Sequence, residues 1–310
     1  MDVDASVVIS TYNRRDMLQL ALASAQRQRD VDLEIIVVDN GSTDGTSAML
    51  ADLRDPRLHI ITNDVSLGPT GGRNCGLERA RGRWVAILDD DDLWAPTKLR
   101  DQIAAAESAQ STWAYTGCVY INDDGTLLGG TMPLDPDDVV TQLPVRYVVS
   151  AGLSSMAWRR DSLPRGGRLD SRMTHMVDWD LSLQLLATGP PAAVMAPLVA
   201  YRQHSSNFSR GVSDVEPEME LIASKHADLR AGRTLDVGAQ SRFFGATALR
   251  AGQRRTAMRY FMTGAKQGDL GCVARIPTVI LPTRSQLWAR RRLASETNWL
   301  AQANTWLTTA

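Results

Sequence analysis

The chain has 310 residues, 44% of them hydrophobic and 22% charged, which is typical of a globular protein with one large or two modest domains. Its formal net charge of −1 gives no electrostatic reason to expect nucleic acid as the main partner. The three cysteines, Cys75, Cys118 and Cys272, are widely separated and lack metal-ligand spacing, so we expect unpaired thiols in a reducing compartment.

The sequence shows no signal for secretion or for a membrane span. It begins Met-Asp-Val-Asp before a strand-like run, whereas a secretory leader has a positive charge followed by an apolar core. No stretch approaches the roughly eighteen apolar residues that are needed to cross a bilayer. We therefore expect a cytoplasmic protein that makes, at most, peripheral contact with a membrane.

The first 95 residues alternate short apolar runs with helical segments. Runs rich in β-branched residues predict four buried strands, at residues 5–10, 33–39, 58–62 and 84–88. Helical spacing and turn signals predict helices at residues 15–28 and 70–81, with a shorter helix that ends at residue 53. Strands that alternate with short helices predict βαβ units, parallel pairing and a sheet covered by helices, as in nucleotide-binding folds.

After residue 96 the order of elements is less regular. Helices are predicted at residues 97–109 and 178–187, and strands at residues 113–121, 154–158 and 192–201. The first of these strands ends in a hairpin turn at residues 122–125. Residues 131–147 contain three prolines and several acids, which predicts a surface excursion that shapes a groove for an acceptor molecule.

From about residue 215 the sequence becomes helical. Amphipathic, Ala-rich segments predict helices near residues 219–231, 239–251 and 254–266. We accordingly divide the chain into a domain at residues 1–212 and a C-terminal helical region at residues 213–310. Within the domain, residues 1–95 form the nucleotide-binding half and residues 96–212 form the acceptor-binding half.

The last part of the chain carries a stripe of large apolar residues. Leu293, Leu300 and Leu307 repeat every seven residues beside Trp299 and Trp306. Such a stripe predicts packing against the body of the protein, or against a second copy in a homodimer. Nearby arginines favour peripheral membrane contact as the alternative: Arg284, Arg290, Arg291 and Arg292.

Acidic residues and a histidine follow the predicted strands: Asp39, the four acids at residues 89–92, and His204. Four consecutive carboxylates repel one another, so they either bind a cation or form a solvated surface turn, which is the usual role of a charge run. Their place at the end of an apolar strand favours binding, because open α/β sheets bind ligands at that edge. Carboxylates suit Mg²⁺ or Mn²⁺, which often bridge acids to phosphates. The sequence therefore predicts a metal–diphosphate site.

Other polar residues have both a functional and a structural interpretation. Asp39 suits a nucleobase or ribose hydroxyl, but it also suits capping of the next turn. Arg73, which follows two glycines, suits a phosphate or the nucleoside. His204 suits the metal or the diphosphate, although a lone histidine is more often structural. Asp178 suits a general base that deprotonates an acceptor, while acids at helix starts often serve as caps alone.

Six motifs in this order resemble the family 2 glycosyltransferases of the GT-A fold, over roughly the first two-thirds of the chain. They are SVVISTYNR at residues 6–14, VDNGSTDG at 38–45, GGRNCG at 71–76, LDDDDLW at 88–94, DWDL at 178–181 and YRQH at 201–204. The resemblance implies a Rossmann-like, mostly parallel sheet flanked by helices, here with a C-terminal helical extension. It also implies a metal-dependent, inverting transfer of a sugar from a nucleoside-diphosphate sugar to a glycan, glycolipid, peptide or secondary metabolite.

The resemblance also assigns roles to individual residues. It implies a donor site that comprises Thr11, Tyr12, Arg14, Asp39, Asn40, Ser42, Gly72, Arg73, Asp89 and Asp90, with Asp39 on the nucleobase. Asp91 is the expected ligand of Mn²⁺ or Mg²⁺, together with Asp89 and His204. Asp178 is the expected general base, and Trp179 and Trp158 are expected to contact the acceptor.

Two departures from the family pattern concern the acceptor side. The usual Glu-Asp pair appears as Val177 and Asp178, and the usual Gly-Gly-Phe-Asp segment appears as GGRLD at residues 166–170. Val177 supports a non-catalytic nucleotide-sugar-binding scaffold as an alternative. A nucleotidyltransferase that makes sugar nucleotides is a further alternative, but the loop after the first strand has no glycine. A dinucleotide oxidoreductase is disfavoured because that loop lacks Gly-x-Gly-x-x-Gly.

Overall fold

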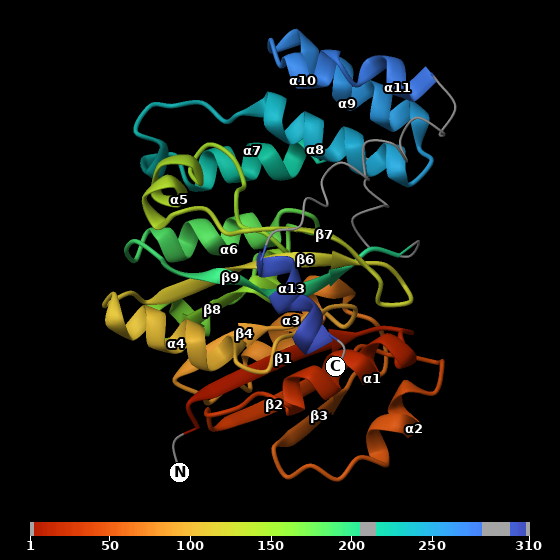
Figure 1. The fold of residues 1–310 in the computed structure, drawn as a ribbon, viewed down its shortest axis with the longest axis vertical. Coiled ribbons are helices and arrows are strands. Elements are labelled where there is room, and N and C mark those ends of the chain that lie inside the picture. The colour runs from red at the N-terminus through yellow and green to blue at the C-terminus, as the bar shows by residue number, and fades with distance from the viewer. Residues whose placement is uncertain (1–2, 205–214, 281–297, 308–310) are drawn as a thin grey trace.

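The computed structural model describes residues 3–204, 215–280 and 298–307, and in these ranges the chain forms one mixed nine-stranded sheet with helices on both faces (Figure 1). The strands are β1 (Ala5–Thr11), β2 (Leu33–Asp39), β3 (Leu58–Thr62), β4 (Trp84–Ile87), β5 (Leu93–Trp94), β6 (Trp113–Ile121), β7 (Leu127–Thr131), β8 (Met156–Arg159) and β9 (Ala192–Arg202). Their order is β3-β2-β1-β4-β8-β6-β9-β5, and β7 pairs with β6.

The strands that carry the predicted site residues point the same way. β1 is parallel to β2 and β4, and β2 is parallel to β3. β8 lies antiparallel between β4 and β6, and β9 is parallel to β6, so β9 has the direction of β4. The carboxyl ends of β2, β4 and β9 therefore meet at one edge of the sheet, as predicted. Some pairs in the sheet are antiparallel, because β5, β7 and β8 run in the opposite direction to their neighbours.

The described helices are α1 (Arg15–Gln26), α2 (Thr46–Ala51), α3 (Gly68–Leu77), α4 (Lys98–Ser108), α5 (Pro136–Gln142), α6 (Val177–Leu186), α7 (Glu216–Lys225), α8 (Val237–Arg250), α9 (Arg254–Lys266), α10 (Leu270–Val273), α11 (Ile276–Ile280) and α13 (Asn298–Leu307). The predicted helices are confirmed in kind, with ends that shift by a few residues. The predicted surface excursion at residues 131–147 contains α5, which the sequence analysis missed.

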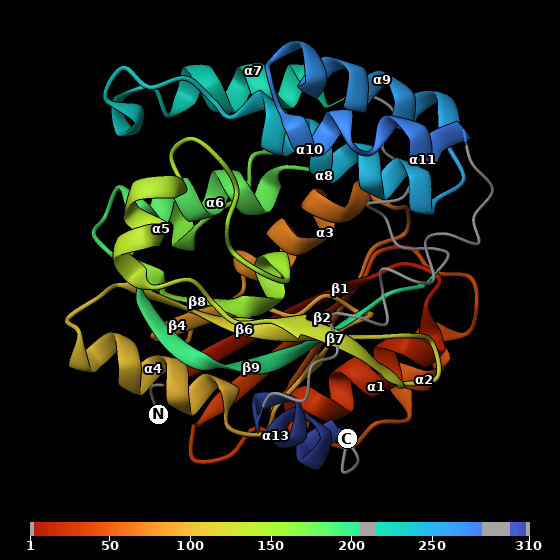
Figure 2. The same ribbon diagram turned by 45° about the horizontal axis from the view of Figure 1, so that its top comes forward.

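Alternation of apolar residues along the strands places one hydrophobic core on each face of the sheet. Val7, Ile9 and Val37 pack with α1 and α4, whereas Val8 and Val38 pack on the face covered by α3 and α6. Figure 2 shows this second face beneath a further layer made by α7 to α11. Helices α7 to α11 thus lie over the helices that flank the sheet, and not against the strands.

The C-terminal stripe packs against the body of the protein where it is described. Leu300, Ala303, Trp306 and Leu307 of α13 contact a small core formed by residues of β5, β6 and β9. Leu293 and the four arginines at 284 and 290–292 lie outside the described residues. A homodimer through this stripe stays a prediction.

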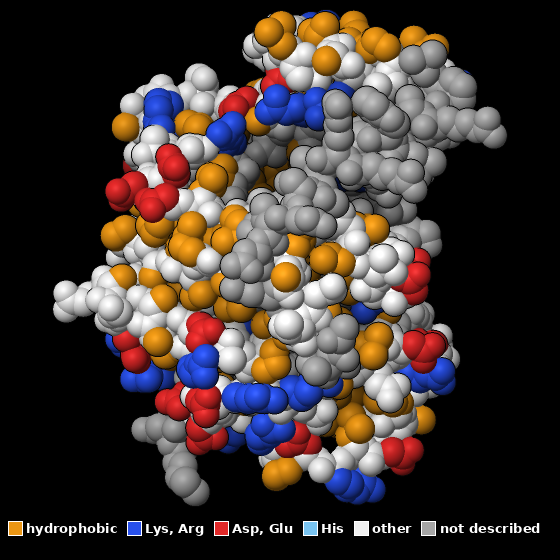
Figure 3. Space-filling view, in the orientation of Figure 1, with side chains coloured by type: hydrophobic (Ala, Val, Ile, Leu, Met, Phe, Trp, Pro, Cys, Tyr) orange, Lys and Arg blue, Asp and Glu red, His pale blue; other side chains and the backbone are white. Residues whose placement is uncertain are grey.

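The outer edge of the C-terminal layer is apolar. Leu270 and Ile280 are exposed there, and Figure 3 shows hydrophobic side chains along this edge of the molecule. None of the helices in the described ranges is long and apolar enough to cross a bilayer. Peripheral membrane contact also stays a prediction.

Candidate active site

A cavity of about 1010 Å³ opens at the carboxyl edge of the sheet. One wall comes from the loops after β1, β2 and β4, a second from residues 147–153 and the start of α6, and a third from α8. Segments that are far apart in sequence therefore share one pocket, and its size suits a ligand as large as a nucleotide sugar.

The four acids after β4 form a turn that is mostly buried. Asp90 is 5% exposed and Asp92 is fully buried, so the solvated surface turn considered from the sequence is wrong. The Thr11 hydroxyl donates to Asp90 at 2.7 Å, and the Arg14 guanidinium donates to Asp90 at 2.9 Å and to Asp91 at 2.8 Å. His204 Nε2 lies 2.9 Å from Asp91 Oδ2. Cationic and hydroxyl groups therefore surround the cluster.

The acids of this turn differ in their affinity for protons. Burial and the charge of Asp91 raise the pKa of Asp90 to about 6, and burial raises the pKa of Asp92 well above its usual range. Burial also acts to raise the pKa of Asp91, but the hydrogen bond with His204 and the charge of Arg14 outweigh it and lower that pKa. Of Asp90, Asp91 and Asp92, Asp91 thus keeps its charge to the lowest pH.

Arg73 supplies a second cation at this edge. α3 begins at Gly68 and carries Arg73 into the cavity, where its guanidinium donates to Asp89 Oδ1 at 2.5 Å. Gly72 does not line the cavity; a Cβ at this position would clash with Ser10 Oγ, so the glycine allows α3 to approach β1 closely.

The loop after β1 places an aromatic ring in the cavity. Tyr12 is 49% exposed and lines the pocket beside Thr11 and Arg14. Asn13 has a positive φ of 52°, and its side-chain oxygen accepts from the N–H of Thr43. The loops after β1 and β2 are thereby tied together below the exposed ring.

Asp39, the last residue of β2, is occupied by contacts with the turn and the helix that follow it. Asp39 is fully buried, and its carboxylate accepts from the N–H of Ser42 and from the hydroxyl of Ser47. These contacts match the turn-capping alternative, and neither Asp39 nor Ser42 lines the cavity. Asn40 does line it, and its side chain is held by Ser66, Leu67 and Gly68.

Asp178 lies in the cavity at the start of α6. Its Oδ1 accepts from the N–H of Trp179 at 2.8 Å, and its Oδ2 would lie 3.0 Å from a Cβ at Gly152. Burial raises its pKa to about 6, opposed by the Trp179 N–H and by Tyr147 and assisted by the charge of Asp89. The Tyr147 hydroxyl is buried without a hydrogen bond of normal geometry, although it lies close enough to Asp178 for each group to shift the pKa of the other.

The two tryptophans predicted to bind an acceptor are core residues. Trp158 is fully buried, donates its indole N–H to Gly166 and does not line the cavity. Trp179 is 1% exposed and donates to the Leu143 carbonyl, although part of it borders the pocket.

Apart from Tyr12 and Trp179, the aromatic residues that line the cavity were not predicted from the sequence. Tyr147 comes from the loop after α5, and Phe243 of α8 is 55% exposed while its neighbour Phe244 is buried. Thr247 and Arg250 continue the same wall. The amphipathic pattern of α8 predicted a helix, but no local signal placed that helix over the pocket.

The predicted metal ligands converge in part. Asp91 and His204 face each other and offer the oxygen and nitrogen donors that suit Mn²⁺. Asp89, the third predicted ligand, is paired with Arg73. In the part of the chain that the structure describes, no group of three or more His, Cys, Asp or Glu residues is arranged to hold a metal ion. The donor chemistry therefore fits a site that a bound ligand completes.

The model of glycosyl transferase family 2 matches residues 6–163, which is half of the chain. The chain belongs to this family. It is 40% identical over 125 residues to the succinoglycan biosynthesis protein ExoO of Rhizobium meliloti, a match that covers 40% of this chain and 36% of ExoO. It is 36% identical over 124 residues to the Escherichia coli UDP-Glc:alpha-D-GlcNAc-diphosphoundecaprenol beta-1,3-glucosyltransferase WfaP, covering 40% and 49% of the two chains. The matched segment thus spans half or less of these relatives.

Solved structures share the GT-A fold of this family 2 member. Staphylococcus aureus TarS 1–349 in complex with UDP-GlcNAc superposes with a TM-score of 0.56 at 15% identity, over 84% of this chain and 81% of TarS 1–349. The mannosyltransferase PcManGT of Pyrobaculum calidifontis, in complex with GDP-Man and Mn²⁺, gives 0.51 at 18% identity, over 93% and 83%. The predicted family and fold are confirmed.

Proposed function

We propose that this family 2 glycosyltransferase moves a sugar from a nucleoside-diphosphate sugar to a hydroxyl or amine acceptor, with inversion at the anomeric carbon. The observation that carries the proposal is that the carboxylate of Asp178 lies in the same cavity as the guanidinium groups of Arg14 and Arg73. Burial raises the pKa of this carboxylate to about 6. Such a group is ionised at neutral pH and still accepts a proton readily, as a general base must.

The donor is proposed to bind at the carboxyl edge of the sheet. Arg14 and Arg73 offer guanidinium groups that suit a diphosphate, and the exposed ring of Tyr12 suits a nucleobase. Asn40 and Thr11 border the same surface. Asp39 is proposed to support this surface from the turn behind it, and its predicted contact with the nucleobase stays a prediction.

The reaction is proposed to be a single displacement. Asp178 takes the proton of the acceptor hydroxyl or amine while the acceptor atom forms a bond to the anomeric carbon. The bond from that carbon to the diphosphate breaks on the opposite face, and the nucleoside diphosphate leaves with the bonding electrons. Arg14 and Arg73 stabilise the charge that develops on the leaving group. A Mn²⁺ or Mg²⁺ ion held by Asp91 and His204 would add positive charge beside the diphosphate.

The acceptor is proposed to enter between the start of α6 and α8. Phe243 and Tyr147 offer rings for a sugar face, and both line the cavity that contains Asp178. WfaP is named for transfer from UDP-Glc to diphosphoundecaprenol-linked GlcNAc, so this pair is the first to test here.

The proposal is tested with UDP, GDP and dTDP sugars in the presence of Mn²⁺. One of these donors should raise the melting temperature of the protein, because a ligand of the folded state stabilises it. With an acceptor, that donor should be converted to free nucleoside diphosphate and a product of inverted configuration. Asp178→Asn should keep the thermal shift and lose product formation.

Two results would overturn the proposal. Full transfer by Asp178→Asn would rule out Asp178 as the general base. Retention of the anomeric configuration would rule out a single displacement. Donor binding without turnover on any acceptor of the polyprenyl-diphosphate class would instead favour the non-catalytic scaffold that Val177 suggests.

A further inference from the structure

One face of α7 contacts the chain on both sides of Asp178. Glu218, Ile222 and Lys225 are spaced by four and three residues, so they lie on one side of this helix. Ile222 between them is fully buried in the core that also contains Met176 and Trp179. The helix is therefore packed directly against the segment that carries the proposed base.

Glu218 binds the backbone immediately before α6. Its carboxylate accepts from the N–H groups of Thr174 at 3.1 Å, His175 at 2.9 Å and Met176 at 2.8 Å. Met176 is the N-cap residue of α6, and its own side chain makes no capping hydrogen bond. A carboxylate from another helix thus binds the N–H of the N-cap residue and of the two residues before it, at the N-terminus of α6, where the helix dipole favours negative charge.

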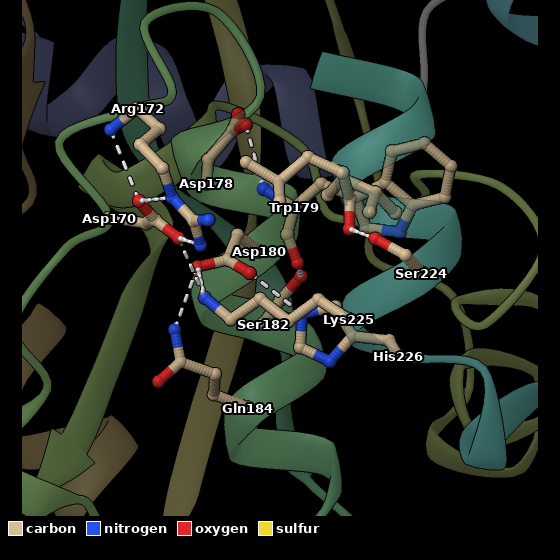
Figure 4. A network of polar contacts seen from close by, with 12 residues as sticks. Asp170, Arg172, Asp178, Trp179, Asp180, Ser182, Gln184, Ser224, Lys225 and His226 are labelled. Atoms are coloured by element: carbon tan, nitrogen blue, oxygen red, sulfur yellow. Dashed lines mark hydrogen bonds and ion pairs between the residues drawn. The ribbon is translucent and has the colours of Figure 1, made fainter. Parts of the chain in front are cut away.

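At the C-terminal end of α7, Lys225 and His226 contact two aspartates on either side of this segment, Asp170 before it and Asp180 after it. Lys225 Nζ lies 2.8 Å from Asp180 Oδ2 and 3.3 Å from Asp170 Oδ2, and His226 Nε2 lies 2.7 Å from Asp180 Oδ1. Figure 4 shows Lys225 and His226 reaching Asp180, while Asp178 points to the other side of the same helix start. Asp180 and His226 are buried, so their contact is shielded from water, whereas Lys225 keeps 29% of its side chain exposed.

We propose that α7 is a clamp that fixes the position of Asp178, and that Glu218 is a positioning residue of the transfer reaction. The inference rests on the proposed function, because it takes Asp178 as the base. Val177 is buried and apolar, so the sequence supplies no carboxylate at the position directly before Asp178. Glu218, from the C-terminal helical region, places a carboxylate on the backbone N–H groups of the three residues before Val177. A small displacement of a catalytic group lowers the rate of the reaction without removing substrate binding. The clamp should therefore affect the turnover rate and not the affinity for the donor.

The test uses Glu218→Gln, which keeps the size of the side chain, and Glu218→Asp, which keeps the charge. Glu220→Gln is the matched control, because Glu220 lies on the same helix and is exposed. Hydrogen exchange of a peptide that covers residues 173–180, the turnover rate and the donor dissociation constant are measured for each variant of the full chain.

Glu218→Gln should speed exchange of the amides at residues 174–176 and lower the turnover rate by roughly tenfold or more, with little change in donor affinity. Glu218→Asp should recover part of the rate, and Glu220→Gln should match the unmodified protein. Unchanged exchange at residues 174–176 would overturn the clamp. Equal losses of turnover and donor affinity, with faster exchange across the whole chain, would show general destabilisation and would also overturn it. If the unmodified protein transfers no sugar, the proposed function fails, while the exchange measurement still decides whether Glu218 holds this segment.

Discussion

His204 Nε2 and Asp91 Oδ2 lie 2.9 Å apart although 113 residues separate them in the sequence. The contact exists because β9 has the same direction as β4, so both residues leave the sheet at one edge. The side chain of His204 is 1% exposed and that of Asp91 is 12% exposed, so the pair is largely shielded from bulk water.

Loss of either member of this pair should weaken metal binding. Mn²⁺ should raise the melting temperature of the protein with bound nucleoside diphosphate. In His204→Ala and Asp91→Asn, the same rise should need a Mn²⁺ concentration roughly tenfold or more higher than in the unmodified protein. Asp124→Asn, in the exposed turn between β6 and β7, is the control. Activity that survives exhaustive chelation would count against a metal at this pair.

The rate of transfer should rise with pH through the pKa of Asp178. Because the base must be ionised, kcat/KM should increase as the pH passes about 6 and then level off. Tyr147→Phe removes a hydroxyl that lowers this pKa, so the rise should move to higher pH. A profile that is flat across this range, measured on a buffer series of constant ionic strength, would exclude Asp178 as the titrating base.

Asp178→Asn should remove activity and raise stability at neutral pH. The folded-state pKa of Asp178 is raised above its unfolded value, so its contribution to stability is full below the unfolded pKa and is lost as the pH rises through about 6. Asparagine stays neutral and does not incur this loss. Melting temperatures at about pH 5 and about pH 8 should show a larger advantage for the variant at the higher pH. An equal difference at both values would contradict the shift.

Phe243 and Phe244 provide a matched pair for the acceptor wall. Phe243→Ala removes an exposed ring in the cavity, so it should raise the KM of the acceptor and leave the melting temperature nearly unchanged. Phe244 is 4% exposed and packs on Tyr260, so Phe244→Ala should lower the free energy of unfolding by about 3 to 5 kcal/mol. An acceptor KM that is unaffected by Phe243→Ala would remove α8 from the acceptor site.

Residues that depend on strand direction were predictable from the sequence. The apolar runs at β1, β2 and β4 alternate with helices, so parallel pairing follows, and with it the shared edge at which Asp39 and the acids after β4 lie. The contact of His204 with Asp91 also required β9 to have the same direction, which the structure confirms although β8 runs antiparallel between β4 and β6. The turn contacts of Asp39 were predicted as one of two alternatives, because aspartate commonly accepts hydrogen bonds from the turn that follows it.

Residues that depend on the packing of distant helices were not predictable. Glu218 and Phe243 are ordinary surface residues in the periodicity of their own helices, and their roles arise when α7 and α8 lie over α6. Trp158 was wrongly predicted to contact a ligand. It is a large aromatic residue near the site, but its size favours burial in the core, where the structure places it.

The third wall of the cavity comes from α8, at residues 237–250, whereas the family model ends at residue 163. Asp178 also lies beyond that point. The family model therefore covers the loops of the proposed donor site and Tyr147, whereas Asp178 and the α8 wall, which we propose to face the acceptor, lie outside it. If α8 contacts the acceptor as proposed, exchanging the C-terminal helices with those of another member should change the acceptor that is used and keep the choice of donor.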